Sequence, residues 1–169
     1  KKIFRTLLLL RACYLIVNAQ DAYSGNGDLR YHVGASIQKL GTGIVTSLDY
    51  GVGESFSFGA QAGYTLGLKE ITDVKKAGFG DRFDLKARFN ANIGSVIGLP
   101  SNVDVYPGLN LGLKNFGGHV GARVFFSKGF GLFAETQFPI AKYNTDASNY
   151  DRLNNQFSFN LGVAFDLTK

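Results

Sequence analysis

The sequence contains one cysteine, three prolines and two histidines, and it has no long uninterrupted apolar run. A lone cysteine cannot form a disulfide within the chain. A transmembrane helix is not expected either, because no stretch of about 18 apolar residues free of charge occurs. The 22 glycines and the 14% aromatic content favour strands and close backbone approach over a helical bundle or disorder. The length of 169 residues suits one domain with a closed core or a single small barrel.

Groups that usually carry catalysis or bind metals are also sparse. His32 and His119 belong to no H-E-x-x-H, H-x-x-E-H or clustered Cys/His pattern, which argues against a metal site. Ser47, Asp49 and His119 could form a nucleophilic set, but nothing in their spacing requires it. We therefore expect no cofactor and no enzymatic activity, and we interpret both histidines as members of a polar network.

The basic excess of the chain lies at its N-terminus. Lys1, Lys2, Arg5 and Arg11 all fall in the first eleven residues, and without them 14 basic residues remain against 13 acidic ones. The rest of the chain is therefore close to neutral. A nucleic-acid partner is not expected, because such partners need a basic patch that persists in the folded domain.

The same N-terminal stretch predicts a secretory signal peptide over residues 1–19. A basic start is followed by the mostly apolar segment 3–17, and Val17 and Ala19 suit positions −3 and −1 of a cut before Gln20. Cys13 would leave with this leader, so the mature chain would contain no thiol. A buried N-terminal helix is the alternative interpretation.

Alternating apolar and polar residues recur eight times after a short polar lead-in, which we expect to be exposed over residues 20–28. Successive side chains of a strand point to opposite faces, so each alternating segment predicts one amphipathic strand. The last one reads N-Q-F-S-F-N-L-G-V-A-F-D-L and exceeds the usual strand length in soluble proteins. The fold class predicted for residues 29–169 is all-β, an eight-stranded antiparallel up-and-down transmembrane barrel in which the first strand pairs with the last. The eight segments are 29–38, 43–50, 56–68, 82–94, 103–113, 116–126, 130–138 and 155–167.

The polar faces of these strands suggest which side is the interior. A soluble exterior is normally covered with charged residues, whereas these faces are largely Gly, Ser and Asn with charges of both signs at mid-strand. Such a mixture suits a cramped lumen in which charges neutralise one another. The apolar faces would then meet lipid. The predicted lumen network is Arg30, His32, Asp49, Arg82, Asp84, Lys86, Arg88, Asp104, His119, Arg123, Glu135 and Asp166. The opposite arrangement, a soluble lipocalin-like barrel with an apolar cavity, is the alternative.

Two long polar connections, 69–80 and 139–154, follow the third and the seventh predicted strand. Because successive strands run in opposite directions, both connections should lie at the same end of the barrel. Outer-membrane barrels combine long external loops with short periplasmic turns. Loops on a rigid scaffold commonly carry recognition. We therefore expect any surface partner to contact these two loops.

The leader ending in N-A-Q, the eight amphipathic strands and the closing strand resemble the small eight-stranded outer-membrane β-barrel proteins of Gram-negative bacteria, most closely Bacteroidetes members. In that family the last strand carries an assembly signal, which Asn160, Gly162, Phe165 and Leu167 match. The resemblance implies export to the outer membrane, contact with outer-membrane lipid and insertion by the barrel-assembly machinery. It also implies a structural or surface-interaction role.

An eight-stranded barrel is just wide enough for its own side chains, so a general diffusion pore is not expected. The alternatives are a soluble periplasmic lipocalin-like carrier of an apolar ligand, a narrow outer-membrane channel, and an outer-membrane enzyme such as an acyltransferase.

Overall fold

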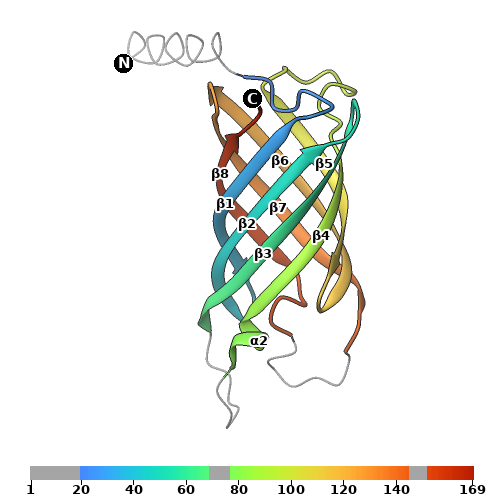
Figure 1. The fold of residues 1–169 in the computed structure, drawn as a ribbon. Coiled ribbons are helices and arrows are strands. Elements are labelled where there is room, and N and C mark those ends of the chain that lie inside the picture. Colours follow the sequence, from blue (N-terminus) through green and yellow to red (C-terminus); the bar gives the residue numbers. More distant parts are fainter. Residues whose placement is uncertain (1–19, 69–76, 145–151) are drawn as a thin grey trace, which may run out of the picture.

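The chain forms a closed eight-stranded barrel in which every strand pairs antiparallel with its neighbours (Figure 1). The computed structural model describes residues 20–68, 77–144 and 152–169. The predicted signal peptide, with Val17 and Ala19, and parts of both long connections lie outside the described residues. The elements are β1 (Leu29–Gln38), β2 (Gly41–Gly51), β3 (Phe56–Leu68), α2 (Phe79–Arg82), β4 (Phe83–Ala91), β5 (Val103–Gly112), β6 (Asn115–Ser127), β7 (Phe130–Lys142) and β8 (Ser158–Asp166).

The predicted all-β barrel and its closure are confirmed. β1 pairs with β8 from Arg30 opposite Asp166 to Gln38 opposite Ser158. This seam leaves no strand of the sheet with an open edge, because the first strand completes the ladder of the last. Within the described ranges, no helix has the length and apolar character needed to span a membrane.

The strands place their polar residues inside the barrel and their apolar residues outside. Arg30, Arg88 and Arg123 are at most 3% exposed, whereas the outward-facing Ile44 and Leu111 are 54% and 60% exposed. This distribution is the reverse of a lipocalin-like barrel, which would hold its apolar face around a ligand. The few large apolar side chains that are buried include Phe125, Phe133 and Tyr106.

Several strands begin or end at other residues than the alternation predicts, and two of these differences have local reasons. β7 continues past Pro139 to Lys142, because a register shift in β6 between Phe116 and Gly117 places Pro139 opposite Gly117. A bulge of this kind accommodates a residue that has no backbone N–H to donate. β4 begins at Phe83, one residue later than predicted, because Arg82 ends the short helix α2.

The connections divide between the two ends of the barrel. Figure 1 places the lead-in and the C-terminus at one end, which we call the terminal end, and α2 with the described parts of both long connections at the other, which we call the loop end. The expectation that the two long connections share one end is therefore confirmed.

The lead-in over residues 20–28 is folded against the terminal end, so the expectation that it is exposed was wrong in part: Asp21, Ser24 and Asn26 are exposed, whereas Ala22 and Asp28 are buried. Ala22 is fully buried, and its N–H donates to the carbonyl oxygen of Ser101 over 2.7 Å. The Tyr23 hydroxyl lies 2.7 Å from the Gly53 carbonyl oxygen and 2.6 Å from that of Phe56. Carbonyl groups at the barrel mouth therefore accept hydrogen bonds from the lead-in, and the Phe56 carbonyl oxygen accepts one from the Val52 N–H as well.

Candidate functional site

The centre of the lumen is organised around Arg88, which β4 projects inward. Its Nη2 donates to Glu135 Oε2 on β7 over 2.6 Å, and its Nε lies 3.2 Å from Asp49 Oδ1 on β2. Nη1 donates to Gln61 Oε1 on β3 over 2.9 Å. One guanidinium therefore links four strands across the barrel. Such a fixed array of donors suits carboxylates held at several angles.

The two histidines lie in this network but do not form a nucleophilic set. Ser47 Oγ is 3.1 Å from Nδ1 of His32, and Asp49 Oδ2 is 3.7 Å from that same nitrogen. A catalytic triad needs the carboxylate and the nucleophile on opposite ring nitrogens. His119 instead contacts Asn90, with its Nε2 2.7 Å from Asn90 Oδ1. The combination of Ser47, Asp49 and His119 is therefore not assembled.

Two further arginines fill the terminal half of the lumen. Arg123 Nη2 donates to Asp104 Oδ2 over 2.9 Å and to Asn92 Oδ1 over 2.7 Å. Arg30 pairs with Asp28, and its Nη1 lies 2.8 Å from Asp166 Oδ2. Each arginine also lies over an aromatic ring, Arg123 over Tyr106 and Arg30 over Phe125, both at 4.9 Å from the ring centroid. Cation–π contact adds to the stabilisation of a desolvated guanidinium.

The lead-in completes this terminal layer. Gln20 bonds to Asp166, and its Oε1 accepts from the Gly129 N–H over 2.9 Å. Asp28 Oδ1 accepts from Ser24 Oγ over 2.6 Å in addition to pairing with Arg30. Burial raises the pKa of Tyr23 to about 12, and the negative charge of Asp28 acts in the same direction. Tyr23 is therefore a neutral hydrogen-bond donor at physiological pH.

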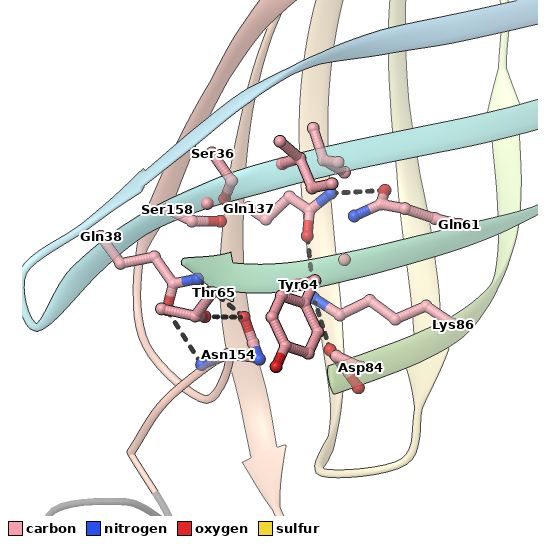
Figure 2. A pocket seen from close by; sticks show the side chains of 14 residues that line it. Ser36, Gln38, Gln61, Tyr64, Thr65, Asp84, Lys86, Gln137, Asn154 and Ser158 are labelled. Carbon is pink, nitrogen blue, oxygen red and sulfur yellow. Dashed lines mark hydrogen bonds and ion pairs between the residues drawn. The ribbon is translucent and has the colours of Figure 1, made fainter. Parts of the chain in front are cut away.

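The loop half of the lumen contains a small cavity next to Lys86 (Figure 2). Lys86 Nζ donates to Gln137 Oε1 over 2.8 Å and lies 3.5 Å from Asp84 Oδ2. Gln137 connects this cluster to the centre of the lumen, because its Nε2 donates to Glu135 Oε1 over 2.6 Å. The cavity has a volume of about 20 Å³, which is enough for a single water molecule and too small for an organic ligand.

Asn154 closes the loop end of this cavity (Figure 2). Its Oδ1 accepts from Gln38 Nε2 over 2.8 Å, and its Nδ2 donates to the Arg82 carbonyl oxygen over 2.9 Å. Its backbone φ is 59°, a left-handed conformation that asparagine tolerates better than most residues. The neighbouring Leu153 is fully buried. Leu153 and Asn154, at the end of the connection between β7 and β8, therefore fill the loop-end mouth of the barrel.

The buried charges of the lumen are compensated by close partners. Each of the four buried cations, Arg30, Lys86, Arg88 and Arg123, lies within 3.5 Å of a carboxylate oxygen. Removing one partner of a buried pair leaves an uncompensated charge and is strongly destabilising. No group of three or more His, Cys, Asp or Glu residues that could hold a metal occurs in segments 20–68, 77–144 and 152–169.

Eleven of the twelve residues predicted for the lumen network lie there, and Arg82 does not. Arg82 is half-buried at the end of α2, where its Nη1 donates to the carbonyl oxygens of Thr65 over 3.3 Å and Leu66 over 2.9 Å. The prediction failed because the strand alternation was extended one residue too far. The helical turn rotates this side chain onto the rim of the barrel.

The four residues of the predicted assembly signal occupy both faces of β8 and its end. Asn160 is buried in the lumen, while Leu167 is exposed. Phe165 faces outward and contacts the ring of Phe130, at a centroid distance of 5.6 Å. Gly162 packs against the backbone of β1, where an added Cβ would meet the Val33 carbonyl oxygen. Their role in assembly stays a prediction.

Several members of the network were not singled out from the sequence. Gln61 shares the inward phase of Ser57 and Thr65 on β3, and Gln137 shares that of Glu135 on β7, so the alternation could have identified both. Tyr106 could have been found in the same way, as the inward aromatic residue two positions after Asp104. Asp28 and Asn154 lie outside the strands, and no periodic pattern points to them.

Taken together, the described lumen is a filled and charge-compensated interior with a cap at each mouth. No curated protein and no solved structure matches the chain. Residues 12–167, which are most of the sequence, match the family described as a family of unknown function, DUF6646. The chain belongs to the DUF6646 family.

Proposed function

We propose that this chain is an integral outer-membrane β-barrel protein with a structural or surface-interaction role and with no general diffusion pore. The observation that carries the proposal is the orientation of the barrel wall, with charges inside and apolar side chains outside. Phe58 and Leu161, for example, are 56% and 51% exposed on the outer face. Soluble monomers rarely expose apolar surface of this extent without a partner to cover it.

The dimensions of the strands support lipid as that partner. The eight strands are 9 to 13 residues long, and a tilted strand needs about 9–11 residues to cross a bilayer. Closure through β1 and β8 pairs every neighbouring strand, which is required where water cannot solvate backbone groups. A soluble carrier would have to bury the outer face in some other way.

The filled lumen argues against bulk transport. Arg88 and its carboxylate partners cross the centre of the barrel, while Asn154 and Ala22 lie at opposite mouths. A narrow channel remains the rival that needs a direct test. In planar bilayers we expect no discrete conductance steps from the purified protein, and reproducible steps would favour the channel.

The remaining parts of the proposal follow from the sequence. Residues 1–19 would direct export, and the barrel-assembly machinery would recognise β8 through Asn160, Gly162, Phe165 and Leu167. With the terminal end in the periplasm, the loop end would face outward. Segments 69–80 and 139–154 would then be the places for a surface partner.

The test is fractionation of expressing cells, followed by gel mobility of boiled and unboiled detergent extracts. We expect recovery in the outer membrane and a band whose mobility changes on heating, because a closed barrel resists detergent until it is boiled. A soluble periplasmic protein with a single mobility would overturn the proposal. A Gly162→Asp variant should lose the heat-sensitive band, because its side chain would collide with β1 at the seam.

A further inference from the structure

The outer wall of β1–β4 contains a depression that the filled lumen does not explain. Outward-facing Thr46 on β2 lies opposite Val33 on β1 and opposite Ala62 on β3. Towards the loop end, the next outward residues of β2, β3 and β4 have large side chains, and Tyr31 of β1 lies on the opposite side of the hollow. A hollow of about 280 Å³ therefore opens above the small pair Thr46 and Ala62. The large side chains of the loop-side wall are Ile44, Tyr64 and Phe83.

The floor of this hollow offers hydrocarbon contacts. Thr46 Oγ1 donates to the carbonyl oxygen of His32 over 3.0 Å, so its hydroxyl group is satisfied within the sheet. Ala62 contributes only a methyl group, and most of the surrounding residues are aliphatic or aromatic. A polar ligand would lose its hydration here without replacement hydrogen bonds, whereas an apolar chain would not.

Basic side chains lie on the rim just beyond the hollow. The guanidinium of Arg82 donates to the Leu66 carbonyl oxygen, which places it two residues along β3 from Tyr64 in the wall. Lys39 is exposed in the turn between β1 and β2, on the same rim. The nearby carboxylate of Asp81 accepts from the Gly78 N–H over 2.7 Å. Arg82 and Lys39 thus place two positive charges on the rim against the single negative charge of Asp81, next to an apolar recess.

We infer that this hollow binds an acyl chain of an anionic membrane lipid, with the lipid phosphate beside Arg82 and Lys39. The inference rests on the lipid-facing orientation proposed above. The hollow is continuous with the apolar outer surface, so a neighbouring lipid chain reaches it without crossing a polar barrier. Arginine and lysine at a membrane surface attract anionic headgroups. Chain and headgroup are recognised by separate residues, which makes the two contributions separable.

The chain-binding part is tested by filling the hollow. Folded protein in mild detergent is mixed with phosphatidylglycerol, and retained lipid is counted by native mass spectrometry. Ala62→Phe should reduce retention about tenfold, the factor expected when two methylene groups lose their burial. Ala122→Phe is the matched control, because Ala122 is exposed on the outer face of β6 away from the hollow. Equal retention by the two variants would overturn the inference.

The headgroup part is tested at Arg82. Arg82→Gln should lower retention of phosphatidylglycerol about fivefold, while Lys39 keeps part of the preference over zwitterionic phosphatidylcholine, and Arg82→Lys should restore it. Equal retention of both lipids by the unmodified protein would refute the anionic preference. A dimer that disappears in Ala62→Phe would identify a second copy as the occupant and refute the lipid.

These outcomes are distinguishable from failure of the proposed function. Each variant is first checked for outer-membrane recovery and for the band whose mobility changes on heating. If the unmodified protein shows neither, the membrane role itself fails. If it shows both while Ala62→Phe binds lipid normally, only the inference about the hollow fails.

Discussion

Replacing Arg88 by methionine should strongly destabilise the barrel. The substitution keeps a long side chain but leaves Glu135 and Asp49 buried without the cation that lies 2.6 and 3.2 Å from them. Breaking one buried ion pair typically costs about 3–5 kcal/mol. Because two carboxylates lose the same partner, we expect a loss near the upper end, about 5 kcal/mol.

A loss of this size would be visible in equilibrium unfolding, since whole domains are stable by only about 5–15 kcal/mol. The chain has no tryptophan, so the assay is a urea titration of the heat-sensitive band, with far-ultraviolet circular dichroism as the second probe. We expect the midpoint to fall to a much lower urea concentration. The slope should be unchanged, because the same surface is exposed on unfolding.

The matched control removes all three charges together. Replacing a whole buried ion network by neutral groups of similar volume is often close to neutral in free energy. The triple variant Arg88→Met, Asp49→Asn, Glu135→Gln should therefore recover most of the loss, to within about 2 kcal/mol of the unmodified protein. If the single variant loses less than about 1 kcal/mol, or if the triple variant is no more stable than the single one, charge compensation does not stabilise this lumen.

Three further predictions concern the mouths and the packing of the lumen. Because the pKa of Tyr23 is raised to about 12 in the folded chain, its contribution to stability should be present below pH 10 and decline as the pH rises through 12. The free energy of unfolding of Tyr23→Phe should lack this decline in alkaline unfolding curves. Gly121→Val should unfold at lower urea because its side chain would meet the ring of Tyr106, and adding Tyr106→Ala should recover part of the loss. Asn154→Ala should cost about 1–3 kcal/mol through lost hydrogen bonds and a left-handed backbone, and should speed amide hydrogen exchange at the loop end but not in the lead-in.

The faces of the strands could be predicted from the sequence because side-chain direction in a strand depends only on local pleating. On β6, Phe125 is in phase with the predicted lumen residue Arg123 and Val120 is out of phase, and the structure buries the first two and exposes the third. On β2, the apolar Val45 is in phase with the predicted lumen residue Asp49, and it is buried. Composition alone would have assigned that residue to the other face.

The partners of the buried charges could not be predicted, because they depend on the register of strands distant in sequence. Arg88 and Glu135 are 47 positions apart, and they meet only because the sheet curls into a closed tube. The prediction for Arg82 was wrong, and that for the lead-in was wrong in part, for a related reason. Both lie where strands end, and there the carbonyl groups of distant segments, such as those of Leu66 and Ser101, decide how the chain folds.

The sequence by itself therefore determined the strand number, the order of the connections and the separation of polar from apolar faces. These properties follow from a period of two residues, which every strand expresses without its neighbours. Only the tertiary structure decided that Asn154 and Ala22 occlude the mouths, and that a small pair, Thr46 and Ala62, leaves a hollow in the outer wall. Those features arise from strand register and barrel closure, which bring together residues that no local pattern connects.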